Sequence, residues 1–163
     1  MTVHTLRRWE ERPVLSAAML NPALIAAAIC WAAKRYEAKS RQPMPLEYAF
    51  LVVPICFHAL TRNALPSTTA THMPRWVNEN QESVFGLAER ASKFAPHVRE
   101  GLRFGLRSGM LTLRDGGFVA KISHSARPVG EVRDILASAA MFGSWAAKTG
   151  SPASVFTLFG VMP

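Results

Sequence analysis

Apolar residues recur along most of the chain at helical spacing, three or four positions apart, and polar clusters separate the runs. Asn21-Pro22 is typical of a helix start, with asparagine as the cap and proline at the first helical position. It predicts a helix over residues 22–39. A second apolar run predicts a helix over residues 45–58, which Pro54 should kink or end. The turn-rich stretch 64–71 predicts a loop.

The middle of the chain predicts three more helices. Residues 74–78 suit a short helix, and residues 82–94 suit a longer one with apolar positions on one face. Residues 96–108 begin at a proline and carry apolar residues every four positions. Gly109 is typical of the position just past a helix end. We expect residues 93–96 to form the turn between the last two helices.

Two short strand-like runs follow. Residues 110–114 and 118–122 flank Asp115-Gly116-Gly117, which is a strong signal for a β-hairpin. Two helices joined by a turn and followed by a hairpin have the order of a winged helix, with a helix-turn-helix and then the wing. The sequence therefore predicts a winged-helix-like part over residues 74–123.

The C-terminal part predicts a helix over residues 131–148, a short one over residues 152–158, and an apolar end. The predicted fold class is mainly α: a helical domain that includes the winged-helix-like unit. We expect a single domain over residues 1–163. Its helical N-terminal part covers residues 14–66, its winged-helix-like part residues 74–123, and its C-terminal helices residues 130–159.

Composition and charge narrow the class of protein. With 163 residues, 49% of them apolar, the chain has enough apolar surface for one core, which excludes wholesale disorder. Lys and Arg number 19 against 11 Asp and Glu, a net charge of +8. This excess favours nucleic acid, an anionic surface or an acidic protein as the partner, without choosing among them. Two cysteines are too few for a disulfide framework or a four-thiolate zinc site.

No catalytic motif is recognisable. The sequence lacks a phosphate-binding loop, a dinucleotide fingerprint, a nucleophile elbow and a zinc-protease motif. Cys56 and His58 are two positions apart, but two further metal ligands are missing, so a buried thiol and a hydrogen-bonded imidazole are favoured. We expect no enzyme, no metal and no cofactor. An enzyme would be indicated only by a metal or cofactor in the purified protein.

The N-terminus and the apolar runs do not predict export or a membrane span. Glu10 and Glu11 are unlike the basic start of a signal peptide. The uncharged run 13–33 contains Ser16 and Asn21-Pro22, and we expect core helices there. We expect a cytoplasmic protein with no membrane partner.

A basic row is the main candidate for a binding site. Arg99, Arg103 and Arg107 are four positions apart and stack on one helix face, while Arg114 and Lys121 flank the predicted wing. Guanidinium groups one helical turn apart suit successive phosphates, so these five residues are the candidate nucleic-acid contacts. The alternative is a solvated helix face that only keeps the domain soluble.

The two apolar ends of the chain are a second candidate. Leu6 and Trp9 near the N-terminus, and Phe156, Phe159 and Val161 near the C-terminus, are candidate partner-binding residues. Ordinary core packing is the alternative.

Several short motifs together resemble a known family, the middle component of bacterial three-component ABC systems. Each motif alone is weak, and their order and the termini carry the resemblance, which covers residues 12–163. The motifs are Arg12-Pro13, Leu20-Asn-Pro-Ala23, Pro45-Leu-Glu-Tyr-Ala-Phe-Leu-Val-Val-Pro54, Thr61-Arg-x-x-Leu-Pro66, Phe85-x-Leu-Ala-Glu-Arg90, Arg99-Glu-x-Leu-Arg-Phe-Gly-Leu106, Gly143-x-Trp-x-Ala-Lys-x-Gly150 and Phe156-x-Leu-Phe-Gly-Val161-x-Pro163.

The resemblance implies a small non-enzymatic adaptor that bridges an SMC/Rad50-like ABC ATPase and an effector subunit. Such systems resemble Lamassu-type anti-phage and anti-plasmid defence modules, in which DNA would be contacted directly or through the complex. The alternative is a free-standing winged-helix transcription regulator. That regulator would not need the long apolar helices predicted over residues 22–39 and 45–58.

Overall fold

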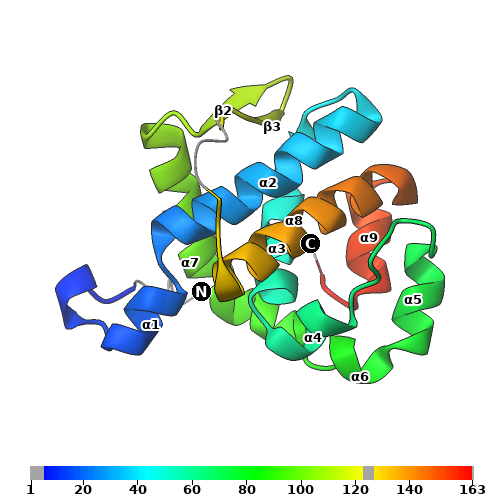
Figure 1. The fold of residues 1–163 in the computed structure, drawn as a ribbon, viewed down its shortest axis with the longest axis horizontal. Helices are drawn as coiled ribbons and strands as arrows, with labels where there is room; N and C mark the ends of the chain where they lie inside the picture. The colour runs from blue at the N-terminus through cyan, green and yellow to red at the C-terminus, as the bar shows by residue number, and fades with distance from the viewer. Residues whose placement is uncertain (1–5, 123–126, 163) are drawn as a thin grey trace.

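Helix α2 (Pro22–Ser40) runs through the middle of the molecule, and the other elements pack around it (Figure 1). The computed structural model describes residues 6–122 and 127–162. The fold is mainly helical, as predicted, with one small antiparallel sheet. The other described elements are η1 (Trp9–Glu11), α1 (Val14–Met19), β1 (Met44–Pro45), η2 (Leu46–Tyr48), α3 (Ala49–Cys56), α4 (Ala59–Ala64), α5 (Met73–Glu79), α6 (Gln81–Val84), α7 (Leu87–Arg107), β2 (Leu111–Arg114), β3 (Gly117–Ala120), α8 (Gly130–Thr149) and α9 (Pro152–Leu158).

Helix α2 begins and ends where its sequence dictates. The Asn21 side chain accepts a hydrogen bond from the Ala23 N–H at 2.8 Å, which confirms the predicted cap. The helix ends at Arg41, whose φ of 63° lies in the left-handed region. Between these ends the alanines of α2 let neighbouring helices approach closely.

The closest approach is the crossing of α2 and α8, which lie side by side in Figure 1. A Cβ atom built on Gly143 would lie 2.1 Å from the carbonyl oxygen of Ala32. Backbone cannot move aside as a side chain can, so any larger residue at this position would push the two helices apart.

Helix α7 is continuous through Pro96, and this corrects the predicted helix-turn-helix. The turn expected at residues 93–96, between helices over 82–94 and 96–108, does not form. Proline costs a helix one hydrogen bond. However, Leu87, Ala91 and Val98 are buried on one continuous face of α7 that packs on α2 and α3, and this packing holds the helix together.

Other element boundaries also differ from the prediction. The chain breaks at Phe85 and Gly86, where Gly86 takes a φ of 69°, so residues 82–84 belong to α6 instead of to the longer helix. Helix α3 continues past Pro54 to Cys56, and α4, which was not predicted, follows it. The predicted helices over 74–78, 131–148 and 152–158 are confirmed as α5, α8 and α9.

The predicted hairpin is confirmed, and it gains a third strand. Asp115 and Gly116 take φ values of 49° and 75°, as a tight two-residue hairpin turn requires. Strand β3 pairs with β2 on one side and with β1 on the other, with Met44 opposite Phe118. The sheet therefore ties residues after α2 to residues after α7.

One stretch of the described residues, Val14–Ser40, is long and apolar enough to cross a membrane by length and composition alone. It contains α1 and the N-cap Asn21 as well as α2. Helix α2 itself is covered by α8, α7, α3 and the sheet, and Ile25, Ile29 and Ala33 on it are fully buried.

Candidate functional site

Arg99, Arg103 and Arg107, here called the arginine row, are exposed along the C-terminal half of α7. Residues four apart lie about 6 Å apart along a helix axis, at a rise of about 1.5 Å per residue. The same half of α7 turns Val98 and Gly105 into the core. The row therefore lies on the solvent-facing side of the helix, as predicted.

Both carboxylates of α7 are held by other cations. Glu100 accepts hydrogen bonds from the two terminal nitrogens of Arg12, at 2.7 and 2.8 Å, and these bonds raise the pKa of Arg12. Glu89 pairs with Lys93 at 2.7 Å. In the part of the chain that the structure describes, no carboxylate forms an ion pair with the arginine row.

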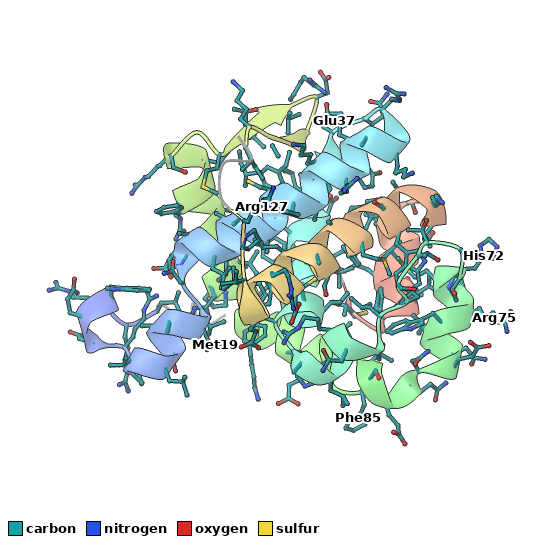
Figure 2. All side chains as sticks on the ribbon, viewed as in Figure 1. Met19, Glu37, His72, Arg75, Phe85 and Arg127 are labelled. Carbon is teal, nitrogen blue, oxygen red and sulfur yellow. The ribbon has the colours of Figure 1, made fainter. Side chains whose placement is uncertain are left out.

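The two predicted basic residues of the hairpin differ from each other. Arg114 on β2 donates a hydrogen bond to Glu37 of α2, which lies beside the hairpin in Figure 2, and it is also 3.9 Å from Asp115. Lys121 is exposed, and its backbone N–H donates to the Met110 carbonyl just past the end of α7. Lys121 forms no ion pair with a described carboxylate, whereas Glu37 and Asp115 offset the charge of Arg114.

Arg99 has a further contact that the rest of the row lacks. Its guanidinium carbon lies 5.9 Å from the centre of the Phe50 ring, within the range of a cation–π interaction. Arg99 also lines a groove of about 630 Å³ between η2–α3, the N-terminal half of α7 and the C-terminal tail. We call this the α7 groove.

The predicted partner-binding residues separate into two groups. Trp9 is 42% exposed, with the Arg12 guanidinium 5.2 Å from its ring, and Leu6 is half-buried. In contrast, Phe156, Phe159 and Val161 are buried in the core of the chain itself. Of these three, Phe156 and Val161 also line the α7 groove.

Sequence reasoning missed a buried arginine on α4. Arg62 donates to the Cys56 carbonyl oxygen at 2.8 Å and to the Glu131 carboxylate of α8 at 2.9 Å, and its side chain is only 7% exposed. It therefore connects α3, α4 and α8. The signal that could have found it is an arginine that directly follows a long apolar run.

A second arginine, Arg90 of α7, extends this polar network. It donates to the Phe85 carbonyl oxygen at 2.8 Å and to the Thr61 hydroxyl at 3.1 Å. The Thr61 hydroxyl in turn donates to the Ser83 carbonyl oxygen. Burial lowers the pKa of Arg90, and burial together with Arg90 and Arg62 lowers the pKa of His58 beside them. We refer to Arg62 and Arg90 as the inner arginines.

The thiols are poorly placed for chemistry. Cys30 is buried and donates to the Met110 carbonyl oxygen at 3.3 Å, and burial raises its pKa to about 12. Burial also raises the pKa of Cys56. At neutral pH both thiols are therefore protonated and weakly nucleophilic. Among the described residues, no three His, Cys, Asp or Glu side chains are grouped as metal ligands.

The comparisons with known proteins give one match. The family model for ABC-three component (ABC-3C) system Middle Component 3 matches residues 9–163. No curated protein and no solved structure shows significant similarity to the chain.

Proposed function

Because the chain belongs to the Middle Component 3 family of ABC-three component systems, we propose that it is the non-enzymatic adaptor subunit of such a system. In this proposal it bridges an SMC/Rad50-like ABC ATPase and an effector subunit. The complex is cytoplasmic and acts on DNA, in defence against phages and plasmids. The family name supports association with the other components of the system. In this proposal, the chain contributes to that association by holding the ATPase and the effector together.

One observation supports a contact with DNA: the arginine row and Lys121 are exposed cations, and no described carboxylate forms an ion pair with them. Surface arginines that form no ion pair with a carboxylate of their own chain favour binding to an external polyanion. Evenly spaced arginines suit a phosphate backbone. We propose that Arg103, Arg107 and Lys121 contact DNA phosphates without reading the base sequence. Arg114 contributes less because Glu37 already neutralises it.

The continuous α7 favours an adaptor over a free-standing transcription regulator. A helix-turn-helix reads bases with a second helix that a turn sets at an angle to the first. Here one helix covers Leu87–Arg107, so the turn that would aim a separate recognition helix is missing.

Co-expression with the ATPase and the effector of the same system tests the adaptor proposal. The tagged chain should co-purify with the ATPase and the effector, and deleting the chain should separate the effector from the ATPase. Binding to neither component, or an ATPase–effector complex that is equally stable without this chain, would contradict the proposal.

A further inference from the structure

The α7 groove is a largely apolar feature of the described surface that the DNA proposal leaves unused. Ala88, Ala91 and Ala95 of α7 line one wall, together with Ser92. The opposite wall carries Phe50 of α3.

Small residues of α7 form one wall of the groove. They recur three or four positions apart, so they form one strip along two helical turns, about 11 Å at a rise of about 1.5 Å per residue. No long side chain of α7 fills this strip, and the neighbouring Leu46 and Met162 are 38% and 90% exposed. A strip of this length accommodates two turns of the apolar face of one helix.

Two charged side chains line the groove, Glu47 of η2 and Arg99 of α7. Arg99, the first residue of the arginine row, lies one helical turn beyond Ala95 and is the last residue of α7 that lines the groove. Its guanidinium packs over Phe50 and forms no ion pair with a described carboxylate. An occupant that carries an acidic residue next to Arg99 would complete that pairing, and the net charge of +8 favours a partner that is acidic overall.

We propose that the α7 groove binds an amphipathic helix of another component of the system, with apolar side chains at i, i+3, i+4 and i+7 and a carboxylate one turn further that pairs with Arg99. This inference rests on the proposed adaptor function and assigns one of its docking sites. A second copy of this chain is the disfavoured occupant because it would bring two strongly basic molecules together. DNA is disfavoured by the apolar walls.

The test uses the co-expressed complex and a variant that fills the groove. Ala95→Trp should weaken binding of one component at least about tenfold, because the added ring occupies the site of its apolar face. Ala137→Trp, at an exposed position of α8 outside the groove, is the matched control and should bind as wild type does. Thermal unfolding of both variants checks that the fold is kept.

A crosslink and a charge reversal identify the occupant. Photo-reactive benzoylphenylalanine in place of Met162, which lines the groove and is 90% exposed, should crosslink to a helical segment with an acidic residue. Arg99→Glu should weaken the complex, and arginine in place of that acidic residue should restore it. The crosslink and the charge reversal still test the proposal if the Ala95→Trp variant fails to fold.

The outcomes separate the two proposals. Wild-type chain that binds neither component removes the adaptor function and this site with it. A wild-type complex that Ala95→Trp and Arg99→Glu leave intact overturns the groove alone, as does a crosslink to a second copy of the chain or to a segment without a carboxylate.

Discussion

Two sets of arginines on neighbouring parts of the fold behave in opposite ways. The inner arginines, Arg62 and Arg90, donate hydrogen bonds to carbonyl, hydroxyl and carboxylate oxygens of the chain itself. The outer ones, Arg103 and Arg107, are exposed and form no ion pair with a described carboxylate. Because α7 carries members of both sets, the difference lies in what packs against each side of the helix. The inner set stabilises the fold, and the outer set is left for a partner.

Among the inner arginines, Arg62 should contribute most to the free energy of unfolding. Arg62→Ala removes a buried side chain and leaves the Cys56 carbonyl oxygen without its donor, so the free energy of unfolding should fall by about 2–4 kcal/mol. Urea unfolding measures it. The matched control, Arg103→Ala, should stay within about 0.5 kcal/mol of wild type, and equal losses in the two variants would contradict the distinction.

Arg90 should show a smaller loss because its side chain is only partly buried. Arg90→Ala leaves the Phe85 carbonyl oxygen without its donor and the Thr61 hydroxyl without one of its partners, and we expect a loss of about 1–2 kcal/mol in the same measurement. Arg107→Ala, on the outer side of the same helix, is its control. A stability unchanged by Arg90→Ala would show that this part of the network contributes nothing.

The smallest effect is on the pH dependence of stability. Burial and the inner arginines lower the pKa of His58 below its ordinary value of 6.5. The unfolded chain therefore binds a proton more readily than the folded one, so the stability present above pH 6.5 is lost as the pH falls toward the folded pKa. Burial, aided by Arg12 and opposed by Glu100, also lowers the pKa of His97 and adds to the same trend.

Urea unfolding across this pH range checks the prediction. His58→Asn keeps a side chain able to cap α4 but removes the titration, so its stability should fall less steeply below pH 6.5 than that of wild type. His72→Asn, at an exposed position, should follow wild type. A wild-type stability that rises on acidification would contradict the assignment.

The parts of the fold that the sequence predicts are those with local signals. The Asn21-Pro22 cap, the Asp115-Gly116 turn and the exposed side of Arg103 each follow from neighbours in the chain. The continuity of α7 depends instead on packing against α2 and α3, which outweighs the hydrogen bond lost at Pro96.

In the candidate sites, too, the sequence predicts only those features that depend on neighbours along the chain. The sequence predicts the arginine row because helical spacing alone puts those residues on one face. It does not separate Phe156 in the core from Trp9 at the surface, since both are apolar residues near a chain end. The groove requires α3, α7 and the tail to meet, which no local pattern encodes.

The salt dependence of DNA binding measures whether the outer arginines, Arg103 and Arg107, bind a polyanion. Arg103→Ala/Arg107→Ala should weaken binding to an arbitrary duplex and reduce the slope of log affinity against log salt by about 2, close to one per lost phosphate contact. The control Arg75→Ala/Arg133→Ala removes two exposed, ion-paired arginines elsewhere, Arg75 pointing away from the body in Figure 2, and should leave the slope unchanged. Equal slopes for both double variants and the wild type would contradict the account.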